Sequence, residues 1–208
     1  MLINDEYNPK YCWAWNRVYV KSNGRIPCWC DTGETHTILS KSLEDNDFIL
    51  DIVNSKEMRE MRLKILQDNE YYIKECKTCC CMIDIDKGRH SRFVNNKVAV
   101  EEIEAKRDTA LKLLTKEANK NKPLGSISRI QEIQVEPSFP CNLRCPGCLQ
   151  GRVENPLSTE ERPYILPLEW FKNIIASSIN NDVKIGRIAF VGRGEPTLNK
   201  ELGEMIKY

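Results

Sequence analysis

The sequence has no long hydrophobic run and no surplus of charge of either sign. No stretch of about eighteen apolar residues occurs, so no membrane-spanning helix is expected. The 31 Lys and Arg residues balance the 30 Asp and Glu residues to a formal net charge of +1, and no basic run is present. A nucleic acid or other polyanion is therefore not an expected partner.

Histidine is scarce, and the first residues do not have the pattern expected of a secretory leader. His36 and His90 are the only two histidines, and each lies in a polar stretch without a partner pattern, so histidine catalysis is not indicated. Asp5, Glu6 and Lys10 precede any apolar run, unlike a signal peptide. With no export signal, the ten cysteines indicate metal ligation in the reducing cytoplasm rather than disulfides.

Three of these cysteines, Cys141, Cys145 and Cys148, lie within eight residues of one another, after a predicted strand at 130–135. Thiolates are the usual ligands of iron–sulfur clusters, and such a loop can place three sulfurs around one face of a cubane cluster. Closed sites normally have four protein ligands, so a local set of three leaves one metal position open. A mononuclear zinc site with a distant fourth ligand is the alternative.

A second motif follows some forty residues later. Residues 187–191 form an apolar strand pattern that runs directly into Gly192-Arg193-Gly194-Glu195-Pro196. A glycine turn at a strand end lets the backbone approach a small ligand, because glycine has no Cβ. Glu195 adds a carboxylate beside this backbone, although most turns of this kind are only turns.

Together the two motifs resemble the radical S-adenosylmethionine (SAM) superfamily, in which a Cys-x3-Cys-x2-Cys loop follows the first strand and a Gly-Glu-Pro type motif follows the second. The resemblance implies that the three cysteines hold a [4Fe-4S] cluster whose open iron chelates SAM. It places Gly194, Glu195 and Pro196 at the amino end of SAM. One departure is Gly147, where the family commonly has an aromatic residue close to the adenine.

The N-terminal third of the chain carries a separate cysteine group. Asn23-Gly24 lies between two β-prone runs, Arg17–Val20 and Arg25-Ile26-Pro27, and predicts a hairpin. This hairpin would bring one cysteine before the first strand close to two cysteines after the second strand. These cysteines are Cys12, Cys28 and Cys30.

A helix is predicted from Ser55 to about Asn69, with Ser55 as its N-cap and methionines on one face. It leads to a further group formed by Cys76, Cys79, Cys80 and Cys81. Two separated cysteine groups with a Cys-x2-Cys pair can form a four-thiolate site, and spacing alone does not separate zinc from iron–sulfur.

This arrangement resembles the SPASM or twitch modules of many radical SAM enzymes, which hold auxiliary iron–sulfur clusters. The resemblance implies Cys12, Cys28, Cys76 and Cys79 as ligands, and any of Cys30, Cys80 and Cys81 could replace a neighbour. In the family this module usually follows the barrel, whereas here it precedes it.

The expected fold class is α/β. A helix over 168–179 between the two motif-bearing strands predicts a βαβ unit, with both motifs at the carboxyl ends of adjacent parallel strands. We expect a cysteine-rich α+β module at 1–97, a helical linker at 98–125, and the start of a partial (β/α)6 TIM-type barrel at 126–208. At about 30 residues per βα unit, the last segment holds roughly two and a half units, so we expect a truncated, C-terminally incomplete barrel.

The resemblance implies an enzyme that cleaves SAM reductively and uses the resulting 5′-deoxyadenosyl radical to abstract hydrogen from an unknown substrate. Relatives with auxiliary modules often act on peptides or proteins, and a flavodoxin or ferredoxin is the expected type of reductant. No catalytic side chain is assigned, and the truncated chain is not expected to complete a turnover. A non-enzymatic zinc-binding or electron-transfer protein with two thiolate sites is the alternative function.

Overall fold

A computed structural model describes residues 11–12, 17–27, 41–67, 82–83, 112, 122–148 and 164–208. The described part is a mixed α/β structure built from short strands and a few helices. The strands are β1 (Tyr11–Cys12), β2 (Arg17–Val20), β3 (Arg25–Ile26), β4 (Lys41–Ser42), β5 (Met82–Ile83), β6 (Arg129–Ile130), β7 (Glu132–Val135), β8 (Lys184–Ile185) and β9 (Ile188–Phe190). The helices are the π-helix η4 (Phe48–Val53), α1 (Lys56–Gln67), α3 (Leu168–Asn180), the 3-10 helix η7 (Pro196–Leu198) and α4 (Leu202–Lys207).

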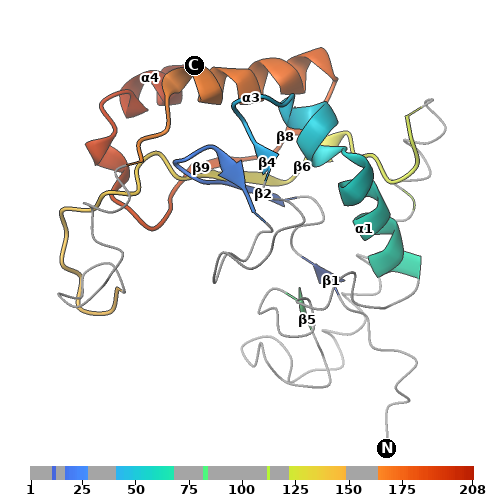
Figure 1. Cartoon of the computed structure of the whole chain (residues 1–208), viewed down its shortest axis with the longest axis horizontal. Helices are drawn as coiled ribbons and strands as arrows, with labels where there is room; N and C mark the ends of the chain where they lie inside the picture. Colours follow the sequence, from blue (N-terminus) through green and yellow to red (C-terminus); the bar gives the residue numbers. More distant parts are fainter. Residues whose placement is uncertain are drawn as a thin grey trace, which may run out of the picture.

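The central sheet has the order β2-β7-β9, and both pairings are parallel. β7 is the middle strand, with Val135 opposite Val20 on one side and opposite Phe190 on the other. α3 and α4 lie along one side of this sheet, above it in Figure 1. The carboxyl ends of β7 and β9 therefore lie side by side at one edge, where α/β proteins place their ligands.

The two faces of the sheet differ in chemistry because side chains alternate along each strand. The face toward α3 is apolar and contributes Val18, Val20, Ile133 and Val135 to the hydrophobic core. The ring of Phe190 lies 5.5 Å from that of Phe171 on α3. The opposite face carries Arg17, Tyr19, Glu132 and Gln134, which alternate with the core residues.

The predicted βαβ unit is confirmed, since β7 and β9 are parallel neighbours and α3 lies between them in the chain. The predicted helix at 168–179 corresponds to α3. Its apolar pattern predicts one face with Leu168, Phe171, Ile175 and Ile179, but the buried face is rotated from this one. Phe171 and Ile174 are buried, whereas Ile179 is 73% exposed. The buried stripe instead continues to Ser178, and Ile179 is turned away because successive helical residues differ by about 100°.

The predicted hairpin at residues 17–27 is only partly present. Its turn forms, with a positive φ of 75° at Gly24, and the Lys21 N–H donates to the Arg25 carbonyl. The strands then separate, because β2 pairs with β7 and β3 pairs with β4. Pairing with β7 in the central sheet buries more of the apolar surface of β2 than an isolated two-stranded hairpin would.

This pairing also bears on the expected module at residues 1–97. Core residues of β2, β3 and η4 share one hydrophobic cluster with β7, α3 and α4. For residues 17–53, the expected boundary near residue 125 therefore does not correspond to a break in the core. The cysteine-bearing segments at 28–40 and 68–81 lie outside the described residues. Of the expected helical linker at 98–125, only Lys112 and residues 122–125 are described, and residues 122–125 are not helical.

The predicted helix after Ser55 is confirmed as α1, and the Ser55 hydroxyl accepts the Met58 N–H at 3.3 Å. Met58 and Met61 are buried as expected. Arg62 is also buried, and its guanidinium donates to the carbonyls of Val53 and Gly125. It thereby attaches α1 to the segment that enters β6. No helix in the described part of the chain is long and apolar enough to cross a membrane.

Candidate functional site

The base of the cysteine loop is held by a short antiparallel contact at the end of β7. The Phe139 N–H donates to the Tyr164 carbonyl, and the Leu166 N–H donates to the Pro137 carbonyl, both at 2.9 Å. Ser138, which is fully buried, lies between these bonds opposite Ile165. The loop that carries the cysteines therefore starts from a fixed stem next to the sheet.

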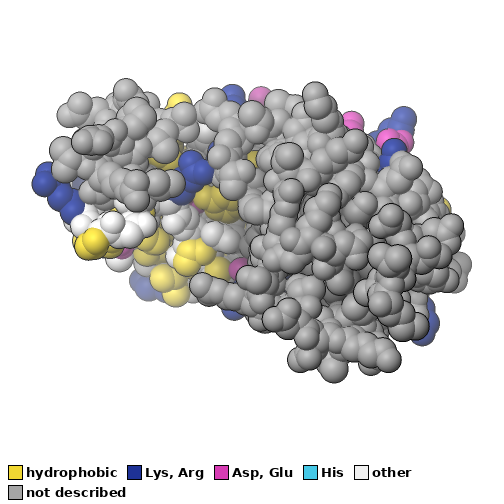
Figure 2. Space-filling view, turned by 90° about the horizontal axis from the view of Figure 1, so that it is seen from below, with side chains coloured by type: hydrophobic (Ala, Val, Ile, Leu, Met, Phe, Trp, Pro, Cys, Tyr) yellow, Lys and Arg dark blue, Asp and Glu magenta, His cyan; other side chains and the backbone are white. Residues whose placement is uncertain are grey.

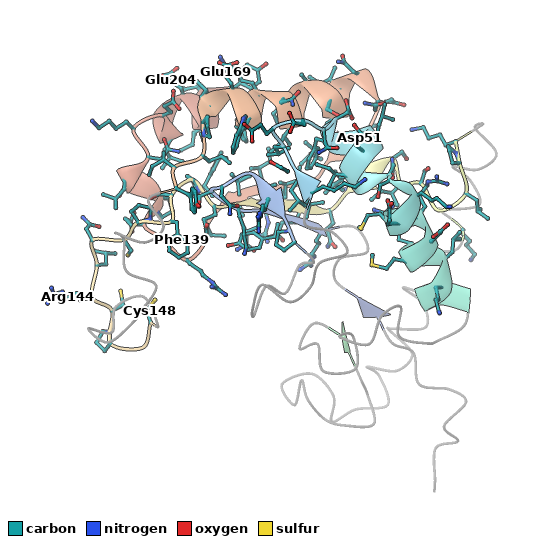
Figure 3. The ribbon with its side chains drawn as sticks, viewed as in Figure 1. Asp51, Phe139, Arg144, Cys148, Glu169 and Glu204 are labelled. Atoms are coloured by element: carbon teal, nitrogen blue, oxygen red, sulfur yellow. The ribbon has the colours of Figure 1, made fainter. Side chains whose placement is uncertain are left out.

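The glycine turn after β9 is bonded to the same stem. The Val191 N–H donates to the Val135 carbonyl, and the Glu195 N–H donates to the Pro140 carbonyl, both at 2.9 Å. Pro140 directly precedes Cys141. The structure thus brings the turn with Gly194, Glu195 and Pro196 against the residue that precedes the cysteine motif, in line with the expected placement of both motifs at the carboxyl ends of adjacent strands. Figure 3 shows the stem at Phe139 and the loop extending from it to Cys148.

Glycine is required at the point where the turn meets the stem. A Cβ on Gly194 would lie 2.5 Å from the Phe139 carbonyl oxygen and closer still to that of Ser138. A Cβ on Gly192 would lie 2.7 Å from the Cβ of Glu136. Both contacts are below any ordinary carbon contact, so glycine is needed here because the turn packs against the protein's own stem. The expected approach of this backbone to a small ligand stays a prediction.

Two buried polar residues that the sequence did not single out complete this junction. Asn199 donates through its amide to the carbonyls of Pro137 and Leu166, at 2.9 Å each. Glu136 accepts the Arg193 N–H of the turn at 2.9 Å. Only their positions in the sequence could have indicated these residues. Glu136 continues the alternation of β7 onto its polar face, and Asn199 follows η7, the short helix after the turn.

The three loop cysteines are free thiols, with Cys145 exposed and the other two partly exposed. Cys145 and Cys148 are joined by a turn in which the Cys148 N–H donates to the Cys145 carbonyl at 3.0 Å. Arg144 lies on the outer side of the loop (Figure 3). Within the described residues, no three His, Cys, Asp or Glu side chains are gathered into a metal-binding group.

The donor set nevertheless fits a thiolate-bound cluster. The thiols are not oxidised to a disulfide, and they lie on an accessible loop. A Cβ on Gly147 would meet no atom within 4 Å, so the loop has open space around it. Seen from below, the described surface includes hydrophobic side chains (Figure 2), and Val191 at the end of β9 is 45% exposed.

Glu195 is held by its own turn. One carboxylate oxygen accepts the Thr197 hydroxyl at 2.7 Å and the Thr197 N–H at 3.1 Å, which caps η7. These two bonds, with the hydroxyl first, lower the pKa of Glu195 from its usual value of 4.5. Glu195 is thus an oriented anion at neutral pH, suited to face an ammonium group.

Replacing Thr197 by valine is expected to raise the pKa of Glu195 toward 4.5, because the hydroxyl donor is lost while the backbone donor stays. The lowered pKa stabilises the fold above the unfolded-state pKa, and that contribution disappears as pH falls through the folded-state value. Thr197→Val should therefore lose less stability on acidification. NMR titration of the Glu195 carboxyl measures the shift; Thr197→Ser is the control, and an unchanged pKa in the valine variant contradicts the assignment.

Of the predicted auxiliary ligands, only Cys12 lies among the described residues. β1 pairs antiparallel with β5, and Cys12 is opposite Met82. Met82 directly follows the Cys79-Cys80-Cys81 run in the sequence. Cys28, Cys76 and Cys79, with Cys30, Cys80 and Cys81, lie outside the described residues.

Comparison with known proteins adds no relative, since no family model, curated protein or solved structure matches the chain.

Proposed function

We propose that this chain is part of a radical SAM enzyme. In this proposal Cys141, Cys145 and Cys148 ligate three irons of a [4Fe-4S] cluster, and the turn at Gly194, Glu195 and Pro196 flanks the amino end of SAM. The observation that carries it is the hydrogen bond from the Glu195 N–H to the Pro140 carbonyl at 2.9 Å. It holds the Gly-Glu-Pro turn against the residue that precedes the cysteine motif, some fifty residues earlier in the chain, and this supports a site in which a cluster and its ligand lie close together.

The chemistry supplied by the bound groups is one-electron cleavage of SAM, which yields methionine and a 5′-deoxyadenosyl radical that abstracts a substrate hydrogen atom. The residues of this chain bind and orient. The stem at 137–140 sets where the cysteine loop starts, and the Glu195 carboxylate is available as an anionic partner for the SAM ammonium. Because both are fixed to one parallel strand pair, they need little rearrangement when the ligand arrives.

The parallel β7–β9 pair, with α3 on one face, supports a partial TIM-type barrel as the complete fold. In such a barrel the face away from the helices lines the interior. That face carries polar side chains here, including Glu132 and Gln134. The remaining strands, most of the substrate pocket and the closure of the site belong to the longer protein that we propose.

The β1–β5 pair supports an auxiliary iron–sulfur cluster held by Cys12, Cys28, Cys76 and Cys79. Cys12 pairs with Met82, the residue that follows Cys81 in the sequence. A cluster at this place could accept an electron from a substrate radical or ligate the substrate. Peptide or protein substrates, a flavodoxin or ferredoxin as reductant, and a cytoplasmic location complete the proposal.

The test is anaerobic reconstitution of the chain with iron and sulfide, followed by EPR of the reduced protein with and without SAM. We expect a brown protein whose EPR signal changes when SAM is added, because SAM binds the open iron. Iron without a response to SAM contradicts the assignment of the turn as a SAM site in this chain. A colourless protein with stoichiometric zinc that resists reconstitution supports the structural alternative and overturns the proposal.

A further inference from the structure

Glu136 is a fully enclosed acid at the junction of the two motifs. It follows β7 directly, and its residue is only 2% exposed. A buried carboxylate is costly unless hydrogen-bond donors replace the water that it loses. The donors around Glu136 come from two separate parts of the chain, residues 19–22 and the turn after β9.

One oxygen of Glu136 faces the segment after β2. It accepts the Ser22 hydroxyl at 2.8 Å and the Ser22 N–H at 3.3 Å. The other oxygen accepts the Tyr19 hydroxyl at 2.7 Å and the Arg193 N–H at 2.9 Å. Hydrogen bonds to a carboxylate are about twice as strong as those between neutral groups. The carboxylate therefore connects β2 to the glycine turn across the end of β7.

The contact with the turn is also steric. Gly192 lies directly on the Glu136 side chain, so near that a Cβ at this position would overlap it. Glu136 thus contacts the turn in two ways: its aliphatic part packs against Gly192, and its carboxylate accepts the Arg193 N–H. Glu195 and Pro196 follow within three residues.

We propose that Glu136 is a positioning residue, which fixes the 192–196 turn in the conformation that receives SAM. This inference rests on the proposed function and adds a residue that lies in neither motif. It makes the ligand site depend on Tyr19 and Ser22, far upstream in the chain. Glu136 acts through the backbone of Arg193 and does not itself contact the ligand.

Glu132 is a matched control on the same strand. It is also buried, at 6% exposed, and lies on the same face of β7, but its partner is the Arg187 side chain before β9. Replacing either acid by methionine removes one buried carboxylate of similar length. A purely structural role predicts similar consequences for both variants, whereas positioning predicts that only Glu136→Met changes the turn.

The first measurement is amide hydrogen exchange in the metal-free protein. We expect Glu136→Met to increase exchange at residues 193–195 by about tenfold or more, the effect of losing one charge-assisted bond, with no such change in Glu132→Met. Glu136→Gln should be intermediate, because its single carbonyl oxygen can still accept the Arg193 N–H. This variant also serves if Glu136→Met does not fold.

The second measurement is a SAM titration of the reconstituted protein, followed by EPR. We expect Kd for SAM to rise about tenfold in Glu136→Met, with iron content unchanged and Glu132→Met near wild type. Equal effects in the two variants, or an unchanged turn in Glu136→Met, overturn the positioning role even when wild type binds SAM. If exchange in the turn increases in Glu136→Met but the EPR signal of the wild type does not respond to SAM, the proposed function has failed instead.

Discussion

Replacing Cys145 by alanine is expected to reduce the iron content of the reconstituted protein from about eight to about four atoms per chain. Two thiolates cannot retain a cubane cluster that needs three, and no other described thiol lies in the loop to replace Cys145. Iron and sulfide analysis with the visible spectrum measures the loss. The remaining four irons would belong to the auxiliary site.

Two control variants test whether this loss of iron is specific to Cys145. Gly147→Ala alters the same loop at a position where an added Cβ meets no atom within 4 Å, so all of the iron should remain. Cys12→Ala should remove the other four irons and leave the response to SAM intact. If Cys145→Ala keeps its full iron content, the loop is not the cluster site.

Gly194→Ala is expected to have the second large effect. Its Cβ would collide with the backbone oxygens of Ser138 and Phe139, which cannot move as a flexible side chain can. Overpacking of this kind costs about 1–3 kcal/mol of unfolding free energy. The displaced turn should also lose the bond from the Glu195 N–H to the Pro140 carbonyl, and with it the binding of SAM. Denaturant unfolding and EPR with SAM measure the two effects.

Gly203→Ala is the matched control for that variant. Gly203 lies in α4, and a Cβ there would meet no atom within 4 Å. Gly203 lies in the first turn of α4, and alanine has a higher helix propensity than glycine, so this variant should be at least as stable as wild type. If Gly194→Ala matches wild type in both stability and SAM response, the close approach is not important.

The parts of the fold that the sequence predicted are those set by local pattern. The 3.6-residue periodicity predicted α3, the N-cap Ser55 predicted the start of α1, and the apolar run before Gly192 predicted β9. The site junction was predictable for a related reason, because two glycines after a strand indicate a close backbone approach. The order strand, helix, strand then required the two motifs to share one sheet edge.

The parts that could not be predicted depend on non-local partners. β2 ends at a turn signal that favours a hairpin, and nothing in its four residues indicates β7 as the partner. Glu136 appeared to be an ordinary polar residue after a strand, because its donors Tyr19 and Arg193 lie far away in sequence. The side chains of the auxiliary cysteines, including Cys12, lie outside what the structure describes, so that site stays a prediction.

The parallel pairing of β2 with β7 has a consequence for how the chain is made. Tyr19 and its acceptor Glu136 are 117 residues apart, so a ribosome working at 5–20 residues per second releases β7 roughly 6–23 seconds after β2. During that interval β2 has apolar residues and an open edge but no partner, which favours pairing with other chains. Long-range parallel pairing is also intrinsically slow to form. Slowed synthesis, which lengthens this interval, should therefore lower the yield of this protein, and a holding chaperone should raise it.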